Sequence, residues 1–457
     1  MSVLARELAL VSAVEPMRIS GRIVELRGLT VLARELPVPV GGLVMIEASA
    51  IGEAIPAEVV GFSQDDTILM PLGQTAGMRR GDRVVGIEHE QTALVGPAML
   101  GRCVNGLGEP IDSLGAMHDL VRTPLSPAPV PALTRPPIKQ PLATGVRALD
   151  LFTTLGRGQR LGIFAGPGVG KSTLMGQIAR HTEADVNVIA LIGERGREAR
   201  EFIDDALGPE GLQRSIVVIA TGDESPVMRL RAAKLACAAA EHFRSLGKAV
   251  MLMMDSVTRF AHAQRQVGLS VGEPPATRGY TPSVFAQLAL MLERAGTVDA
   301  SLGGGSITGL YTVLVEGDEE MDPVADAARG ILDGHISLSR ALAQRGHFPA
   351  IDVLGSVSRV ASAVSTPEHQ AGRRELIKLL AAHKDVEELL QVGAYARGSR
   401  AEADIAIDHK DQIDALLRQS PTDGAEMDAS VRAMLSLAVK TGNELAKRQA
   451  GNQAAGA

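Results

Sequence analysis

The clearest chemical motif is a glycine-rich segment that ends in a lysine and two hydroxyl side chains, Ala165-Gly166-Pro167-Gly168-Val169-Gly170-Lys171-Ser172-Thr173. Glycines let a backbone wrap closely around a phosphate, and the amides of the loop and of a following helix supply partial positive charge. Lys171 adds a full positive charge, and the hydroxyl of Ser172 suits Mg²⁺. The strict motif begins with Gly, for which Ala165 is a small substitute. The segment predicts a phosphate-binding loop (P-loop). A dinucleotide-binding turn fits less well, because its third glycine is spaced differently and it requires no lysine.

Two acidic side chains follow apolar runs of the kind that form buried strands. Asp255 directly follows residues 249–254, and Glu194 follows residues 186–192 after one glycine. At the carboxyl end of such a strand, Asp255 could hold water ligands of Mg²⁺, and Glu194 could orient or polarise a water molecule that attacks a phosphate. Two structural alternatives stay open: Asp255 as an acid that caps a strand, and Glu194 as part of a surface salt-bridge cluster.

The residues around these side chains have the pattern of a parallel α/β sheet. Four apolar runs lack the alternation of half-buried strands: 160–165, 186–191, 215–220 and 249–254. Segments of helical length lie between them: 171–181, 197–207 and 226–246. Strands that are buried on both faces and joined by helical crossovers indicate a parallel sheet. We therefore expect an α/β nucleotide-binding fold that presents the P-loop after a strand and at the start of a helix.

The regions on either side of this sheet have different patterns. Short β-type segments recur through the first hundred residues: 22–26, 29–32, 43–47, 57–62, 67–70 and 83–87. Their close spacing is typical of a small antiparallel barrel or sandwich. Seven prolines between Pro124 and Pro141 favour an extended connector. After about Arg373 the strand pattern ends, and one helical stripe is formed by Met427, Val431, Met434, Leu435 and Ala438.

These patterns divide the chain into three parts. We expect an N-terminal region with a small β-barrel at 1–98, a P-loop domain at 99–375 that includes the connector at 124–141, and a helical C-terminal domain at 376–457. Three domains also agree with the length of 457 residues, at roughly 150 residues per domain.

Composition excludes several classes of function. With 46 Lys and Arg against 53 Asp and Glu, the formal net charge is −7, so no overall positive field attracts nucleic acid or an anionic membrane. Eight Phe, three Tyr and no Trp argue against stacking surfaces for single-stranded nucleic acid. Cys103 and Cys237 stand apart, which argues against disulfides and Cys-based metal sites. No apolar run approaches the ~18 residues of a membrane span. We expect a cytoplasmic protein that binds no nucleic acid and no metal beyond nucleotide-bound magnesium.

Four segments together resemble the catalytic family of the rotary-type ATPases, over nearly the whole chain. They are the P-loop, Gly193-Glu194-Arg195-Gly-Arg-Glu198, Met254-Asp255-Ser-Val-Thr-Arg259, and Pro349-Ala-Ile-Asp352-Val-Leu-Gly-Ser356-Val-Ser358-Arg359. Two further segments are most similar to the flagellar and type III secretion export ATPase branch: Gly272-Glu-Pro-Pro-Ala-Thr-Arg-Gly-Tyr280-Thr-Pro-Ser-Val-Phe285 and Val392-Gly-Ala-Tyr395. The resemblance implies a RecA-like P-loop domain between an N-terminal β-barrel and a C-terminal helical domain.

The resemblance also implies a role for each site residue, with ATP and magnesium as ligands. Lys171 would contact the β- and γ-phosphates, Ser172 the magnesium and Thr173 the α-phosphate. Glu194 would act on the hydrolytic water, and Asp255 on the magnesium shell through water, with Arg195 and Arg259 supporting the phosphate side. Phe348 matches the aromatic that packs on adenine; the alternative is a core phenylalanine. Arg359 matches the arginine finger, a permanently charged guanidinium that stabilises transition-state charge.

The same resemblance implies an assembly and its partners. In this family the arginine finger reaches into the site of the neighbouring subunit. Here one chain carries the P-loop, the glutamate and the finger together. A homo-oligomeric ring, which the resemblance implies is a hexamer, can therefore complete every site. The N-terminal residues 2–14 place Leu4, Leu8 and Val11 on one face of a possible helix, where the branch binds a stator-like regulator; a frayed terminus is the alternative. Other implied partners are a central stalk-like protein, export substrates and their chaperones, and the export gate, with peripheral association at the inner membrane.

Three classes of function are compatible with this chemistry. An export ATPase is favoured, flagellar on overall likeness, with a virulence type III secretion ATPase as the alternative. A catalytic subunit of an ion-coupled ATP synthase is disfavoured by the two branch-like segments that contain Tyr280 and Tyr395. A hexameric RNA translocase is disfavoured because Phe62 is the sole aromatic among the first hundred residues.

Overall fold

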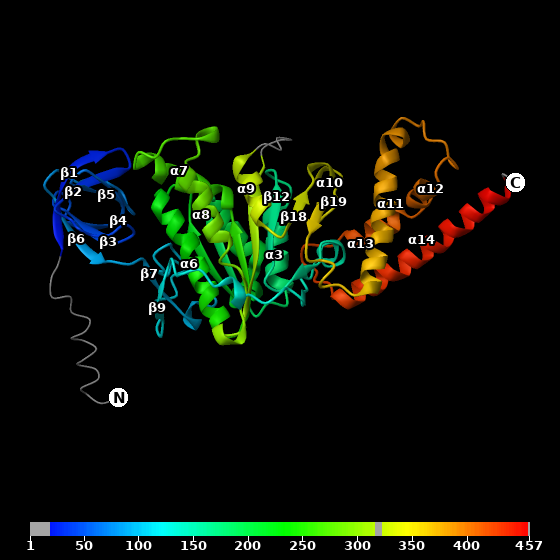
Figure 1. Ribbon diagram of the computed structural model, residues 1–457, viewed down its shortest axis with the longest axis horizontal. Coiled ribbons are helices and arrows are strands. Elements are labelled where there is room, and N and C mark those ends of the chain that lie inside the picture. The colour runs from blue at the N-terminus through cyan, green and yellow to red at the C-terminus, as the bar shows by residue number, and fades with distance from the viewer. Residues whose placement is uncertain (1–18, 316–321, 456–457) are drawn as a thin grey trace, which may run out of the picture.

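The protein is elongated and has three parts in a row (Figure 1). The computed structural model describes residues 19–315 and 322–455. A β-barrel lies at one end, a large α/β sheet in the middle, and a group of helices at the other end. The proposed N-terminal helix with Leu4, Leu8 and Val11 lies outside the described residues.

Six antiparallel strands close the N-terminal barrel in the order β1-β2-β5-β4-β3-β6. They are β1 (Ser20–Arg27), β2 (Thr30–Arg34), β3 (Leu43–Ala48), β4 (Glu53–Ser63), β5 (Asp66–Pro71) and β6 (Arg83–Glu88). Alternate side chains point inward, as Val44, Ile46 and Ala48 do on β3. Pairing of β1 with β6 leaves no open edge, so of the two predicted architectures the barrel is confirmed.

The chain then crosses to the central sheet through a small two-stranded sheet and the proline-rich connector. Strand β7 (Thr92–Val95) pairs with β9 (Val121–Pro124), and β8 (Cys103–Val104) joins the edge of the central sheet. Beyond β9 the chain is irregular except for a short 3₁₀ turn at Ala132–Thr134 and the two-residue strand β10 (Pro141–Leu142). This agrees with the scarcity of amide donors in the prolines.

Nine strands form the central sheet, in the order β19-β18-β12-β17-β15-β13-β14-β8, with β16 paired to β17. The strands after the connector are β12 (Arg160–Ala165), β13 (Val186–Ile192), β14 (Ser215–Ala220), β15 (Ala249–Asp255), β16 (Gly296–Thr297), β17 (Ser306–Leu314), β18 (Gly334–Leu338) and β19 (Ile351–Ser358); β11 (Leu155–Gly156) pairs with β10 outside it. Only the pairs β18–β19 and β16–β17 are antiparallel among the described strands of this sheet. The four predicted apolar runs are all strands here, and they are parallel.

Helices cover both faces of this sheet. One face packs against α6 (Pro226–Ser245), α7 (Val257–Ser270), α8 (Pro282–Leu292) and α9 (Pro323–Ile331). The other face packs against α2 (Arg147–Phe152), α3 (Lys171–His181) and the segment α4 (Gly196–Glu201), a π-helical turn (Phe202–Leu207) and α5 (Gly208–Gln213). The single helix predicted at 197–207 is therefore divided, and its second half is wider than an α-helix.

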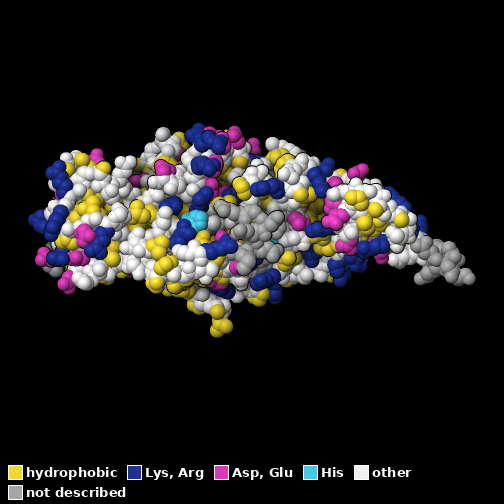
Figure 2. Space-filling view, turned by 90° about the horizontal axis from the view of Figure 1, so that it is seen from above, with side chains coloured by type: hydrophobic (Ala, Val, Ile, Leu, Met, Phe, Trp, Pro, Cys, Tyr) yellow, Lys and Arg dark blue, Asp and Glu magenta, His cyan; other side chains and the backbone are white. Residues whose placement is uncertain are grey.

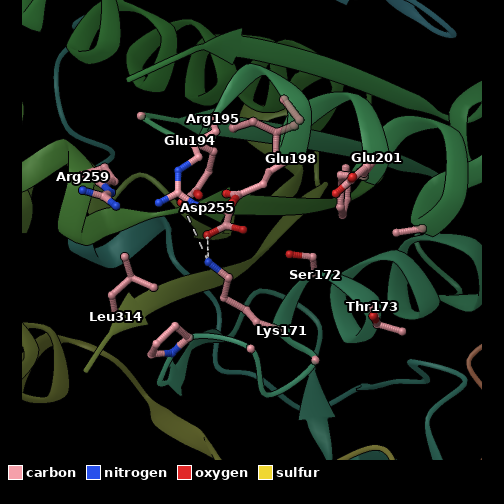
Figure 3. A pocket seen from close by; sticks show the side chains of 18 of the residues that line it. Lys171, Ser172, Thr173, Glu194, Arg195, Glu198, Glu201, Asp255, Arg259 and Leu314 are labelled. Carbon is pink, nitrogen blue, oxygen red and sulfur yellow. Dashed lines mark hydrogen bonds and ion pairs between the residues drawn. The ribbon is translucent and has the colours of Figure 1, made fainter. Parts of the chain in front are cut away.

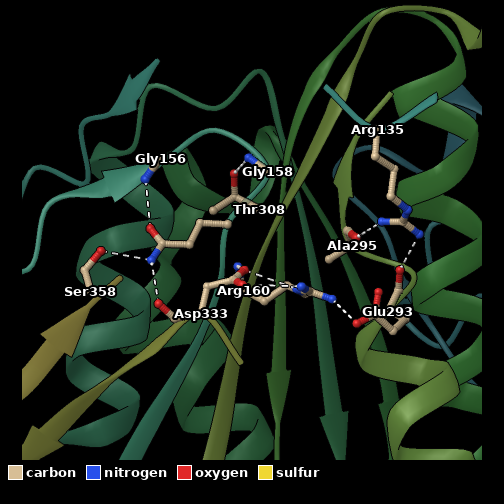
Figure 4. A network of polar contacts seen from close by, with 10 residues as sticks. Arg135, Gly156, Gly158, Arg160, Glu293, Ala295, Thr308, Asp333 and Ser358 are labelled. Atoms are coloured by element: carbon tan, nitrogen blue, oxygen red, sulfur yellow. Dashed lines mark hydrogen bonds and ion pairs between the residues drawn. The ribbon is translucent and has the colours of Figure 1, made fainter. Parts of the chain in front are cut away.

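A network of polar contacts fixes the amino ends of the central strands (Figure 4). Arg160, at the start of β12, contacts Asp333 through its backbone amide at 3.0 Å and its Nε at 3.2 Å, and it forms an ion pair with Glu293. The amide of Gln159 donates to Ser358 Oγ at 2.9 Å, at the end of β19. The backbone carbonyl of Asp333 accepts from the Arg359 amide at 2.9 Å. These contacts hold the end of β19, and with it Arg359, at a fixed place beside the sheet.

The C-terminal helices pack on the α3 face and end the chain. They are α11 (Pro367–Gln391), α12 (Ala401–Asp408), α13 (Lys410–Leu417) and α14 (Met427–Ala455), after the short α10 (Arg340–Gln344). In the predicted stripe of α14, Met434 and Ala438 are buried. Within 19–315 and 322–455, no helix combines the length and the apolar character needed to cross a membrane. Figure 2 shows Lys and Arg interspersed with Asp and Glu over the visible face.

Candidate active site

A cavity of about 520 Å³ lies at the carboxyl edge of the central strands. The P-loop, the segment after β13, the end of β15 and the end of β17 all contribute to its walls (Figure 3). Because the carboxyl ends of parallel strands meet at one edge, residues far apart in the sequence are brought together there. All the residues predicted for phosphate and magnesium contacts line this cavity except Val169, which is buried beneath the loop.

The P-loop turns between β12 and α3 with the geometry that anion binding requires. Strand β12 ends at Ala165 and α3 begins at Lys171, as predicted. Gly168 and Gly170 have φ of 75° and 91°, a left-handed conformation that favours glycine. The first turn of α3 therefore directs its amides toward the cavity, and the side chains of Ser172 and Thr173 are exposed there.

Lys171 lies between two carboxylates. Its Nζ is 2.5 Å from Asp255 Oδ1 and 3.9 Å from Glu194 Oε1. The three side chains are largely buried, with exposed fractions of 13%, 4% and 16%. In Figure 3 they converge on one point from α3, β15 and the segment after β13. Glu194 is therefore not part of a surface salt-bridge cluster, the structural alternative considered above, because its side chain is largely buried.

Glu194 has the environment of a general base. Burial, and next the charge of Asp255, raise its pKa from 4.5 to about 7, while Lys171 and Arg259 act in the opposite direction. Its Oε1 atom is buried and has no hydrogen-bond partner among the described residues. The adjacent Gly193, with φ of 71°, packs so tightly that a Cβ there would lie 2.8 Å from the Cβ of Arg259. The carboxyl group is thus held in place and poised to change its charge near neutral pH.

The two predicted supporting arginines have different positions. Arg259, on the first turn of α7, lines the cavity, and its Nε is buried without a hydrogen-bond partner in the described chain. Arg195 has an 80% exposed side chain and forms an ion pair with Glu198 at 2.7 Å. Burial by itself would raise the pKa of Glu198, but hydrogen bonds with Arg195 and Glu194 outweigh this effect and lower the pKa below its ordinary value. Glu198 belongs to the motif 193–198, but the sequence predicted no role for it. Its spacing of four residues from Glu194 is the one sequence feature that could have indicated a contact between the two side chains.

Phe348 lies in a second, smaller cavity that adjoins the P-loop. This cavity is about 210 Å³ and shares Gly170 and Thr173 with the larger one. Phe348 is 42% exposed, so it is not the core phenylalanine of the alternative interpretation. Gln419 and Pro421, from the segment between α13 and α14, form part of the wall. No sequence pattern pointed to these two residues, because they reach the P-loop only through the packing of the C-terminal helices.

Arg359 is the one predicted catalytic residue outside the cavity. It follows β19, its side chain is exposed, and its guanidinium makes no hydrogen bond or ion pair with the described residues. Its backbone is fixed by Asp333, as described above. The backbone at Arg359 is thus held in place, while its guanidinium lies outside the cavity, exposed and without a partner among the described residues.

The donor set fits a magnesium–nucleotide complex. In the described residues no cluster of three or more His, Cys, Asp or Glu side chains is arranged to hold a metal ion. Mg²⁺ is commonly bound by one or two protein oxygens together with phosphates and water, and Ser172 with Asp255 offers such a partial set. The buried unpaired atoms of Glu194 and Arg259 indicate that the cavity is built to receive polar partners.

Comparison with known proteins shows which family the chain resembles and places a nucleotide-binding domain in its central part. The model of the ATP synthase alpha/beta family, nucleotide-binding domain, matches residues 145–358, and that of the T3SS EscN ATPase C-terminal domain matches 365–436. A flagellum-specific ATP synthase of Bacillus subtilis is 48% identical over 93% of this chain and 95% of its own. A type 3 secretion system ATPase of Xanthomonas euvesicatoria is 49% identical over 92% of this chain and 93% of its own.

A solved structure extends the likeness from the sequence to the three-dimensional fold. The assembled ATPase EscN, in complex with its central stalk EscO, from the type III secretion system of enteropathogenic E. coli, superposes with a TM-score of 0.84 at 42% identity. The match covers 92% of this chain and all of that one. The chain therefore belongs to the family of flagellum-specific ATP synthases and type 3 secretion system ATPases.

Proposed function

We propose that this chain hydrolyses Mg-ATP as one subunit of a hexameric ring and that the hydrolysis energises protein export through the flagellar apparatus. The observation that carries the proposal is the convergence of Lys171, Glu194 and Asp255 in one cavity beside the P-loop. A loop that merely binds phosphate would explain Lys171 but not the two carboxylates beside it. A buried carboxyl group with a pKa near 7 beside it suits activation of a water molecule.

The proposal assigns each contact with ATP and magnesium to a side chain of the cavity, and the positions of these side chains support the assignment. The loop 166–170 and Lys171 bind the β- and γ-phosphates, Thr173 the α-phosphate, and Phe348 the adenine in the adjoining cavity. Ser172 and, through water, Asp255 would hold the magnesium, which when bound would neutralise charge that develops on the phosphates. Glu194 accepts a proton from the attacking water, and Arg259 supports the phosphate side of the site, together with Arg195.

Arg359 completes the site of a neighbouring subunit in this proposal. Its position outside its own cavity and its unpaired guanidinium support a role in trans. Because each chain supplies both a P-loop and a finger, a closed ring of identical subunits completes every site. EscN is described as assembled and in complex with its central stalk EscO, and we extend both properties to this chain.

Mixed rings test this arrangement. The Lys171→Ala and Arg359→Ala variants are each expected to be inactive alone. In a random one-to-one mixture, about a quarter of the interfaces join an intact P-loop to an intact finger, so hydrolysis should return to about a quarter of the wild-type rate. No recovery in rings that native mass spectrometry shows to be mixed would contradict the role in trans.

The exported cargo and the remaining partners belong to the same proposal. We place the protein in the cytoplasm, attached peripherally to the export gate, with a stator-like regulator at its N-terminal region and export substrates and chaperones at its C-terminal helices.

A virulence secretion system is the second candidate, because the Xanthomonas relative is as similar as the Bacillus one. Restoration of swimming in a bacterium that lacks its flagellar export ATPase, by the wild type and not by Glu194→Gln, tests the flagellar assignment; secretion without swimming favours the second candidate.

A further inference from the structure

Thr312 occupies the strand that separates the P-loop strand from the strand of Asp255. Strand β17 lies between β12 and β15 in the sheet, and Thr312 is fully buried. On the same face of β17, Leu310 packs in the core with α3, and Leu314 lines the large cavity. The side chain of Thr312 therefore lies directly beneath the cavity floor, on the nucleotide side of the sheet.

The hydroxyl of Thr312 donates to the oxygen of Asp255 that also contacts Lys171. Thr312 Oγ1 is 2.7 Å from Asp255 Oδ1 and 3.2 Å from the Met254 carbonyl. The shorter contact is to a carboxylate, which makes it the stronger hydrogen bond. Two donors thus converge on Oδ1, one on a rigid central strand and one at the end of a long flexible lysine. The second oxygen, Oδ2, has no hydrogen bond within the described residues.

A phosphate in the P-loop competes with Asp255 for Lys171. When the ammonium group turns toward the phosphates, Asp255 Oδ1 loses one of its two donors, and a buried carboxylate without donors is costly. Thr312 cannot turn away in the same manner, because β-branched side chains are restricted at χ1 and the strand is buried on both faces. Asp255 therefore keeps one fixed partner whatever Lys171 does.

We propose that Thr312 is a positioning residue that fixes Asp255 Oδ1 so that Oδ2 faces the cavity and receives the water ligands of a nucleotide-bound divalent cation. The inference rests on the proposed function, since it concerns the same site. It also explains why a hydroxyl side chain stands at a fully buried position among apolar neighbours. Thr312 touches Asp255 and not the reacting atoms.

Three variants test the role. Thr312→Val replaces the hydroxyl by a methyl group of similar size, and Thr312→Ser keeps the hydroxyl. Thr308→Val is the matched control, because Thr308 is equally buried on the same face of β17 but accepts a hydrogen bond from the Gly158 amide at 2.9 Å, at the opposite edge of the sheet (Figure 4). Both valine variants remove one buried hydrogen bond, so loss of stability alone affects both.

The measurement is the binding of a fluorescent ADP analogue over a range of Mg²⁺ concentrations and in EDTA, with ATP hydrolysis and thermal melting alongside. For Thr312→Val we expect the Mg²⁺ concentration at half-maximal binding to rise about tenfold, as for loss of one hydrogen bond to a charged group, with a smaller change in EDTA. Thr312→Ser should restore the wild-type value and Thr308→Val should leave it unchanged.

Equal loss of binding with and without Mg²⁺, or no change in either, would overturn the positioning role. A shift of the same size in Thr308→Val would do the same, because it would assign the effect to the stability of β17. If the wild-type chain itself hydrolysed no ATP in the presence of Mg²⁺, the proposed function would fall first. A wild type that hydrolyses ATP beside a Thr312→Val variant with normal Mg²⁺ dependence would overturn this inference alone.

Discussion

Replacement of Glu194 by Gln should stabilise the protein while it removes activity, and the stabilisation should depend on pH. In the folded chain the pKa of Glu194 is raised from 4.5 to about 7, first by burial and then by Asp255. The folded state therefore holds this proton more tightly than the unfolded state does. The contribution of Glu194 to stability is greatest below pH 4.5 and falls as the pH rises toward and through 7, where the folded chain must carry a buried negative charge at this residue.

The size of the effect follows from the two pKa values. A change from 4.5 to about 7 corresponds to about 3 kcal/mol at 1.36 kcal/mol for each tenfold change in proton affinity. Water in the cavity screens part of this cost, which leaves about 2 kcal/mol. Gln has the same shape and no charge, so the variant should be about 2 kcal/mol more stable than the wild type at pH 8 and less than about 1 kcal/mol more stable at pH 5.

Thermal melting at pH 5 and pH 8 measures the difference, at one protein concentration and without nucleotide, since ligands and association shift the melting temperature by mass action. We expect a gain of a few degrees at pH 8, together with a fall in kcat of about a hundredfold or more. Glu201→Gln is the control, because Glu201 also lines the cavity but its side chain is 52% exposed. A gain that is equal at both pH values, or a loss at pH 8, would refute the environment deduced for Glu194.

Three further outcomes are expected. Phe348→Ala should weaken the binding of adenine nucleotides about tenfold and leave inorganic triphosphate unaffected; calorimetry with both ligands checks this, and unchanged ADP affinity would remove Phe348 from the site. Gly168→Ala should weaken nucleotide binding through strain of about 1 kcal/mol at φ 75°, whereas Gly442→Ala, in open space on α14, should raise the melting temperature. Asp112→Asn should lower the free energy of unfolding, measured by urea denaturation, by about 2 kcal/mol at pH 7 and by less in acid. The reason is that the hydrogen bond from Arg102 holds the pKa of Asp112 far below its ordinary value, although burial acts in the opposite direction.

Much of the fold could be predicted because its strongest determinants are local. The apolar run 160–165, the glycines of the loop and Lys171 at the helix start follow one another directly, so the bounds of β12 and α3 agreed with the prediction. Strand β17 was not predicted, although it is central. Its sequence, Ser-Ile-Thr-Gly-Leu-Tyr-Thr-Val-Leu, mixes polar residues into a strand that is buried on both faces. The hydroxyls of Thr308 and Thr312 are accommodated by partners from distant segments, Gly158 and Asp255.

The roles of the site residues stay predictions, and the unpredicted parts of the site share one physical cause. Thr312 on β17 contacts Asp255 at a separation of 57 residues, and Gln419 with Pro421 reaches the cavity of Phe348 from the C-terminal helices. Such partners have no spacing rule, because tertiary packing alone determines which distant side chain meets which. Motif residues could be named from the sequence, whereas the groups that orient them required the structure.

The two edges of the central sheet use polar side chains in opposite ways. At the amino edge, Gln159 satisfies its carbonyl on the Gly156 amide and its amide on Ser358, so its hydrogen bonds are internal and serve to hold β19 in place. At the carboxyl edge, Glu194 and Arg259 keep buried atoms without partners, at a cost of about 1–3 kcal/mol each. A substitution such as Gln159→Leu should therefore lower stability, whereas Glu194→Gln should raise it. The two substitutions change stability in opposite directions if the amino edge is a scaffold. The carboxyl edge is then built for a ligand that supplies the missing hydrogen-bond partners.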